Sequence, residues 1–247
     1  MRARQNGFTL VEMAMVVVVV ALVVGGVLAG KDMLENSRRQ SVINDINSYK
    51  TATALFMQRY NYMPGDFPNA STYWGASANN GGADGFIGGS TSTPLAMASS
   101  TEPLFSWQHL SEAELINGNY TGTGATYTPG SNVPRSALNN NAFSFFYAAP
   151  GSGNGYFNAN YKHVIVYGSA TSLATTVPTN RAGLKPFEAA DIDRKIDEGM
   201  PGLGNVLSYT SHASGPTTGC ALGTTSAATY VTTTTGVACS LIFITGF

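Results

Sequence analysis

Charge is what this chain has least of. Only 11% of its 247 residues are Asp, Glu, Lys or Arg, less than half of the usual share of about a quarter. Between residues 61 and 180 the charged residues are Asp66, Asp84, Glu102, Glu112, Glu114, Arg135 and Lys162. A surface of Ser, Thr, Asn and Gly suits chains that pack side by side, because dense charge is costly to desolvate. An ordinary solvated, loop-rich surface fits the same composition.

Positive charge is scarcer than negative charge. Beyond residue 7 the chain has 11 basic and 14 acidic side chains, a net charge of −3, since Arg2 and Arg4 are the other two of its 13 basic residues. No basic stripe marks a nucleic-acid site, so we expect no nucleic-acid partner. The doublet Arg38-Arg39 lies in a predicted helix, and we expect it on a solvated or juxtamembrane face.

Catalytic motifs are lacking as well. The segment Gly25–Lys31 is similar to a phosphate-binding loop, but Asp32 stands where Ser or Thr is needed and no strand precedes it. His109, His163 and His212 lack the spacing of metal ligands, and we expect His109 on the face of a helix. Neither a nucleophile elbow nor a Cys-His signature occurs. We therefore predict no catalytic residues and no enzymatic activity.

A long apolar run is the most prominent feature that is present. Glu12 is the only charge in residues 8–30, and the uncharged part 13–30 has 18 residues, roughly 27 Å as a helix and close to the hydrocarbon thickness of a bilayer. Arg2 and Arg4 before the run predict a cytoplasmic N-terminus and a translocated remainder. A carboxylate in a membrane segment costs about 2.5 kcal/mol or more, so Glu12 needs a reason.

Three interpretations of this segment compete. A secretory signal peptide would be cleaved near Val27-Leu28-Ala29, but its apolar core is about 7–15 residues long and does not begin with an acid. A plain membrane anchor explains the length and leaves Glu12 as a cost. Cleavage before the apolar run, between Gly7 and Phe8, makes Glu12 the fifth residue of the mature chain.

The residues around this third site resemble a known family. Gly7-Phe8-Thr9-Leu10-Val11-Glu12 is similar to the processing signal of type IV prepilins and type II secretion pseudopilins. The resemblance implies that a prepilin peptidase cuts after Gly7 and methylates the amine of Phe8. If subunits stack with a stagger, the Glu12 carboxylate meets the Phe8 ammonium of a neighbour, and each charge gains a partner in low dielectric. Glu12 and Phe8 are thus the predicted assembly residues.

One long helix is predicted for the N-terminal part of the chain. Residues 31–60 contain no Pro or Gly, and apolar side chains recur at helical spacing, at Val42, Ile43, Ile46, Tyr49, Phe56 and Tyr60. Pro64-Gly65 ends the helix soon afterwards. Residues 8–60, 53 in number, span roughly 80 Å as a helix. The first half is apolar all round and requires lipid or other subunits, whereas the amphipathic second half requires a sheet against it.

The remainder of the chain predicts a small α+β domain. Short β-branched and aromatic runs indicate an antiparallel sheet, with strands at Ala142–Ala148, Tyr161–Tyr167, Gly204–Ser208 and Ser240–Thr245. Helices are expected near Leu104–Ile116 and over Pro186–Gly199, and Gly-rich loops at 79–85 and 88–92. The predicted fold class is α+β: a long N-terminal helix packed on a small antiparallel sheet, with a C-terminal disulfide loop.

Three further blocks extend the resemblance. Tyr62–Ala70, Trp107–Tyr120 and Ala189–Gly199 are similar to blocks in a group of bacterial pseudopilin-like proteins. Members of that group carry an adjacent acidic pair before the last Gly, and Asp197-Glu198 keeps it. The resemblance supports the architecture without separating a pilus subunit from a secretion pseudopilin.

Cysteine is nearly absent, and the two that occur, Cys220 and Cys239, enclose a Ser/Thr-rich loop without a charged residue. In an exported, disulfide-permissive compartment we expect them to pair; two free buried thiols are the alternative. Closing a ring of about 20 residues stabilises by roughly 3 kcal/mol on the chain-entropy model. A C-terminal disulfide-bounded loop also resembles the variable exposed region of type IV pilins.

An acidic cluster lies on the helix predicted to begin at Pro186. Asp193 and Asp197 are four residues apart and Asp191 is near them. Carboxylates this close repel one another unless a cation, or Arg194 or Lys195, intervenes. Calcium suits such hard oxygen ligands, so these three acids form a candidate calcium site. The competing interpretation is structural, with the acids as helix-dipole partners and a C-terminal capping network. The sequence indicates no other cofactor.

These observations divide the chain into four segments. Residues 1–7 are the predicted leader, 8–30 the transmembrane and polymerisation half of the helix, 31–60 its amphipathic half, and 61–247 a globular pilin-like domain.

The resemblance implies a structural subunit of a type IV pilus or a type II secretion pseudopilus. It would be held in the bacterial inner membrane with its N-terminus cytoplasmic, and then enter a periplasmic or extracellular filament. The implied partners are identical or related pilin subunits, prepilin peptidase, an inner-membrane assembly platform and, before assembly, membrane lipid. The alternative is a membrane-anchored periplasmic binding or adhesive domain that does not polymerise.

Overall fold

A computed structural model describes residues 8–88, 101–124, 126–138, 141–153, 156–170, 182–210, 219–223 and 225–247. The chain divides into two compact units, one ending at Arg38 and the other running from Arg39 to Phe247. The predicted cleavage residue Gly7, most of the predicted loop 88–92 and His212 lie outside the described residues. The division into leader, membrane and globular segments stays a prediction.

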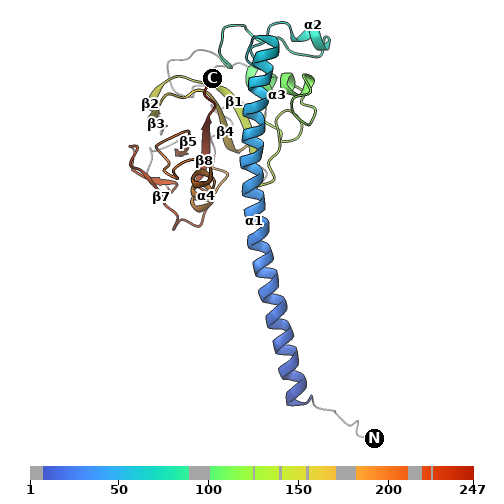
Figure 1. Ribbon diagram of the computed structural model, residues 1–247, viewed down its shortest axis with the longest axis vertical. Helices are drawn as coiled ribbons and strands as arrows, with labels where there is room; N and C mark the ends of the chain where they lie inside the picture. The colour runs from blue at the N-terminus through green and yellow to red at the C-terminus, as the bar shows by residue number, and fades with distance from the viewer. Residues whose placement is uncertain are drawn as a thin grey trace. The chain divides into compact units, whose positions relative to one another are not determined.

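Helix α1 runs from Leu10 to Tyr60 and has 51 residues, two fewer than predicted (Figure 1). In the unit that ends at Arg38 its apolar side chains are exposed all round, and Leu10, Val17 and Leu22 are each more than 60% exposed. Among the described residues, α1 is the one helix long and apolar enough to cross a bilayer, judged by length and composition. So large an apolar surface requires lipid or protein around it.

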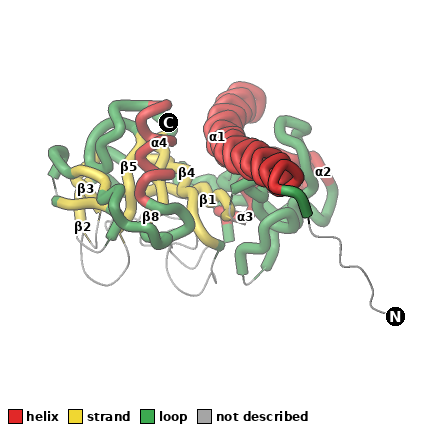
Figure 2. Tube along the Cα trace, turned by 90° about the horizontal axis from the view of Figure 1, so that it is seen from below, coloured by secondary structure: helices red, strands yellow, loops and turns green. Residues whose placement is uncertain are grey.

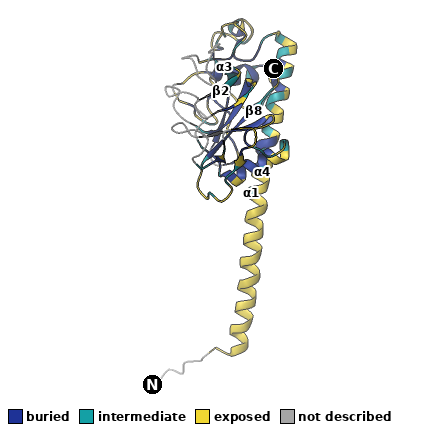
Figure 3. Ribbon diagram, turned by 90° about the vertical axis from the view of Figure 1, so that its left-hand side faces the viewer, coloured by how far each residue is buried: buried dark blue, intermediate teal, exposed yellow. Residues whose placement is uncertain are grey.

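From Arg39 onward the same helix becomes one-sided (Figure 3). Its buried residues lie on one face of the helix, at Arg39, Val42, Ile43, Ile46, Ala52, Thr53 and Phe56. Tyr49 packs edge-on against the rings of Trp107 and Phe143, with centroids 5.0 and 5.1 Å away. The apolar face predicted from helical spacing is buried and supplies one side of the core, but it begins at Arg39, and residues 31–38 of the predicted amphipathic half are largely exposed.

The end of α1 follows from the backbone of two residues. Asn61 adopts a φ of 59°, and its N–H donates to the carbonyl of Met57 at 2.8 Å, which is a left-handed C-terminal cap. Gly65 has a φ of 98°, and a Cβ there would lie 2.4 Å from the Ser106 hydroxyl. Only glycine fits at position 65, because the backbone has a positive φ there and passes too close to Ser106 for a side chain.

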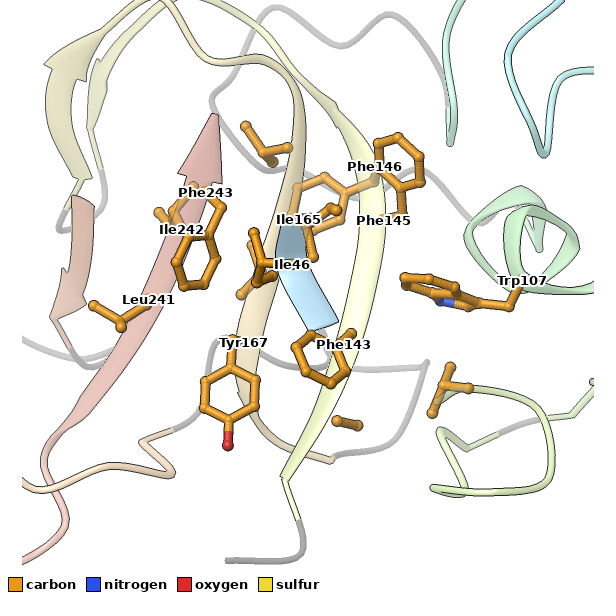
Figure 4. Close-up of a cluster of buried hydrophobic side chains, with 14 of the residues drawn as sticks. Ile46, Trp107, Phe143, Phe145, Phe146, Ile165, Tyr167, Leu241, Ile242 and Phe243 are labelled. Atoms are coloured by element: carbon orange, nitrogen blue, oxygen red, sulfur yellow. The ribbon is translucent and has the colours of Figure 1, made fainter. Parts of the chain in front are cut away.

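The sheet has four antiparallel strands in the order β1-β4-β8-β5. They are β1 (Asn141–Ala148), β4 (Lys162–Ser169), β8 (Cys239–Ile244) and β5 (Val206–Thr210). All four predicted strands are found, shifted by one or two residues. The side chains of the central pair are buried on both faces, and Figure 4 shows Phe143, Ile165 and Phe243 beside Ile46 of α1 in this core.

Two of the shorter helices were predicted and flank the sheet. Helix α3 (Glu102–Glu112) packs near β1, and α4 (Pro186–Ile196) packs near β5 and β8, as Figure 2 shows for α4. Helix α2 (Ala70–Trp74) and two short hairpins were not predicted; the hairpins pair β2 (Gly151–Gly153) with β3 (Tyr156–Ala159) and β6 (Ala221–Leu222) with β7 (Thr229–Tyr230). Elements of two to five residues are too short for a periodic pattern.

The two cysteines form a disulfide, as predicted, with their Cα atoms 5.0 Å apart. Cys239 is the first residue of β8, and Cys220 directly precedes β6. Cys239 also exchanges backbone hydrogen bonds with Leu184, each 2.9 Å long. The bond therefore closes the polar loop against the start of a central strand.

Candidate processing and assembly site

The start of α1 is closed by a capping box made of Thr9 and Glu12. The Thr9 N–H and hydroxyl donate to Oε2 of Glu12 at 2.8 and 2.9 Å, and the Glu12 N–H donates to Oγ1 of Thr9 at 3.2 Å. This reciprocal pair, with Glu three residues after Thr, satisfies two of the N–H groups that a helix start leaves unpaired. It also places a carboxylate where the helix dipole favours one.

Glu12 therefore has a role inside its own chain, which the sequence analysis missed although the Thr-x-x-Glu spacing is visible. The acid is not purely a cost in an apolar segment, because its carboxylate accepts hydrogen bonds from the N–H and the hydroxyl of Thr9. A carboxylate accepts about four hydrogen bonds, and the two found here use a single oxygen. Phe8, the predicted new N-terminus, directly precedes the cap and is 78% exposed. The pairing of Glu12 with a neighbour's Phe8 stays a prediction.

An ion pair fastens the first turn of the second unit to α4. Nε of Arg39 lies 2.7 Å and Nζ of Lys195 lies 3.0 Å from the same oxygen of Asp191. The Arg39 side chain is 9% exposed, and its guanidinium lies 5.8 Å from the centroid of the Phe187 ring. The prediction that both arginines of the doublet lie on a solvated face is wrong for Arg39, because a partner 152 positions away in the sequence compensates its burial.

The three acids of the candidate calcium site do not converge. Asp191 pairs with the cations just described, whereas Asp193 accepts the Tyr230 hydroxyl at 2.8 Å and the Gly199 N–H at 3.3 Å. Asp197 lies beyond the helix end, where it accepts the N–H groups of Asn205 and Val206. Across the described ranges no group of three or more His, Cys, Asp or Glu side chains is placed to hold a metal ion. The structure thus corrects the calcium prediction and favours the structural interpretation.

The pKa values of Asp193, Asp197 and Glu198 are shifted by burial and by one another. Burial, with smaller contributions from the charges of Glu198 and Asp197, raises the pKa of Asp193 to about 7, although hydrogen bonds from Tyr230 and Gly199 act in the opposite direction. A hydrogen bond with Glu198 lowers the pKa of Asp197, and the same bond raises the pKa of Glu198. Repulsion between neighbouring carboxylates is relieved in this way whenever one of them holds a proton.

His109 lies on α3, as predicted, but on its buried face. Its Nδ1 accepts the Gly65 N–H at 2.9 Å, so Nε2 carries the ring proton and donates to the Asn79 carbonyl at 2.7 Å. The ring stacks on Phe56 of α1 with centroids 6.1 Å apart, and burial lowers its pKa to about 4. The neutral ring joins α1, α3 and the turn after α1.

Acid is expected to lower the stability that the buried, neutral His109 contributes. The folded-state pKa of about 4 lies below the value of about 6.5 for an unfolded histidine, so the unfolded chain binds more protons between these values and stability falls as the pH drops. The free energy of unfolding of wild type, relative to His109→Gln, should therefore decrease by about 2 kcal/mol between pH 7.5 and pH 5. Chemical unfolding of the full chain in detergent at both pH values measures it, and a difference independent of pH would contradict the assignment.

The N-terminal segment of the chain matches a model of a known protein family. The chain matches the family model described as the prokaryotic N-terminal methylation motif, over residues 2–28. This motif is the signature of type IV prepilins and pseudopilins, so the resemblance inferred from residues 7–12 is confirmed. No curated protein and no solved structure matches the chain. The matched segment holds Gly7, Phe8, the Thr9–Glu12 cap and most of the apolar half of α1.

Proposed function

We propose that this protein is a structural subunit of a type IV pilus or a type II secretion pseudopilus, made as a precursor. The observation that carries the proposal is the position of the methylation motif. It covers residues 2–28, and thus the capped start of a helix that is long and apolar enough to cross a membrane. The proposed role is structural and not enzymatic.

Processing would occur at the boundary between Gly7 and Phe8. Prepilin peptidase removes residues 1–7 and methylates the amine of Phe8, while the apolar half of α1 holds the subunit in the inner membrane with its N-terminus cytoplasmic. An assembly platform then extracts the subunit, and identical or related pilin subunits replace lipid around the exposed apolar side chains.

Glu12 has two successive roles in this proposal. In the membrane its carboxylate caps its own helix through Thr9, with donor distances of 2.8 and 2.9 Å. In the filament the remaining acceptor sites receive the Phe8 ammonium of a neighbouring subunit, because a charge buried among apolar helices requires a partner. The pairing sets the stagger between subunits.

Dependence on the peptidase tests the proposal. We expect filaments sheared from peptidase-containing bacteria to contain this protein, and we expect a Gly7→Phe variant, which blocks cleavage, to remain in the membrane fraction at wild-type level. Immunoblots of sheared and membrane fractions distinguish the two. Recovery of the Gly7→Phe variant in filaments at the wild-type level would contradict the proposal.

A membrane-anchored periplasmic binding or adhesive domain that does not polymerise is the second candidate. The Thr9–Glu12 cap favours this candidate, because a cap gives Glu12 a role that needs no neighbouring subunit. The two candidates differ in one requirement: polymerisation needs the charge of Glu12, whereas a cap needs only its hydrogen bonds.

A further inference from the structure

A cavity of about 310 Å³ lies at the C-terminal end of α1, the part of the helix beside α2 in Figure 1. Met57, Tyr62 and Met63 form its apolar walls, and Asn61, Asp66 and the loop residues Ala83 and Gly85 complete the lining. This volume is at the lower end of the range for small-molecule sites, roughly 300–1,000 Å³. The cavity is therefore of a size for a ligand of a few heavy atoms.

The polar group of the cavity is a buried acid without a countercharge. Asp66 is 2% exposed, and its two carboxylate oxygens accept the N–H groups of Asp84 and Gly85 at 2.9 and 3.0 Å. Among the described residues no ion pair involves Asp66. Since a carboxylate accepts about four hydrogen bonds, these two donors leave acceptor capacity unused.

The surroundings of Asp66 add further negative potential. Burial raises the pKa of this carboxyl, and the nearby carboxylates of Asp84 and Glu102 raise it further, outweighing the two N–H donors. The last turn of α1 contributes the partial negative charge of a helix C-terminus. A buried charge ordinarily has a partner of opposite sign, and these groups all favour a cation.

We propose that this cavity binds an ammonium or guanidinium group carried on a short apolar stem. The charged head would lie at Asp66, and the stem would lie against Met57, Met63 and Tyr62, because thioether and aromatic side chains suit organic cations. These walls suit a hard metal ion poorly, since such ions prefer several oxygen ligands. The ligand comes either from a basic side chain of a neighbouring subunit or from a free small amine.

Methionine methyl groups report on this site directly. The full-length protein, labelled at its methionine methyls and kept in detergent, is titrated with n-butylammonium and separately with n-butanol. We expect saturable NMR shifts of the Met57 and Met63 methyls with n-butylammonium and at least about tenfold weaker binding of the neutral alcohol. Equal responses to both probes, or no saturable shift, would overturn the proposal.

A pair of variants locates the site. Asn61→Lys supplies an ammonium from within the cavity lining and should abolish the n-butylammonium shifts. Gln58→Lys adds the same charge to an exposed position of α1 and should leave them unchanged. The methionine signals distant from the cavity show that each variant is folded. An equal effect of both variants would mean that binding is not at this cavity.

A second titration distinguishes the two sources of the ligand and rests on the proposed polymerisation. If a neighbouring subunit supplies the basic group, n-butylammonium binds the detergent-solubilised subunit but is excluded from assembled filaments. If the ligand is a free amine, both forms bind the probe. The first titration uses unassembled protein. Its result therefore tests the cavity proposal whether or not the protein forms filaments.

Discussion

Glu12→Gln is expected to reduce incorporation of the protein into filaments by about a hundredfold or more, while the protein still enters the membrane. Glutamine at this position keeps the capping box but offers no charge to the Phe8 ammonium of a neighbour. An ammonium left without a partner among apolar helices costs several kcal/mol, and each 1.4 kcal/mol is about a factor of ten. Immunoblots of sheared filaments, normalised to the membrane fraction, measure the loss.

Two control variants separate the charge from the cap. Glu12→Val removes both and should also block assembly, with membrane insertion intact or improved. Thr9→Val keeps the charge and removes the hydroxyl that bonds Glu12 at 2.9 Å, so it should still assemble. Normal filaments from Glu12→Gln, together with a defect in Thr9→Val, would show that Glu12 serves only as a cap and would contradict its pairing with the Phe8 ammonium of a neighbour.

Replacing both cysteines by serine is expected to lower the free energy of unfolding by about 3 kcal/mol, as the loss of a ring of this size predicts. The bond ties Cys220 to the first residue of β8. Because β8 lies between β4 and β5, it keeps both neighbours, whereas the loop between the two cysteines loses an anchor. We expect new protease cleavage between Ala221 and Ala238, with α1 and the sheet intact.

The Asp193–Tyr230 bond provides the matched control. Tyr230 lies in the same loop, and its hydroxyl donates to Asp193 of α4 at 2.8 Å. Tyr230→Phe removes that single bond, which is worth about 1 kcal/mol, and leaves the disulfide in place. If the double cysteine variant and Tyr230→Phe gave the same cleavage pattern, or if reductant left wild-type cleavage unchanged, the disulfide would not be what orders the loop.

The elements that depend on local patterns were predictable from the sequence. The side of α1 that carries Val42, Ile46 and Phe56 follows from helical spacing, and the four sheet strands follow from short aromatic and β-branched runs. Pro64-Gly65 predicts that α1 ends near this point, although the helix already ends at Tyr60 with a cap at Asn61. The disulfide follows from two cysteines in a chain that the sequence predicts to be exported.

The side-chain partners were not predictable, because they join distant parts of the chain. Arg39 is buried and pairs with Asp191, which lies 152 positions later in the sequence. The calcium prediction failed because acids close in sequence point to different partners: Asp191 to α1, Asp193 to the disulfide loop through Tyr230. The Thr9–Glu12 cap is the exception among these side-chain contacts. Its two residues are only three positions apart, so the cap could have been predicted from the sequence.

The N-terminus of the protein in sheared filaments is the most direct test of the account. Intact-mass measurement and N-terminal sequencing of that material should give a chain that begins at Phe8 and carries one methyl group on its amine. A chain in filaments that begins at Met1, or a mature protein that begins at Gly30 after signal-peptide cleavage, would contradict the prepilin account.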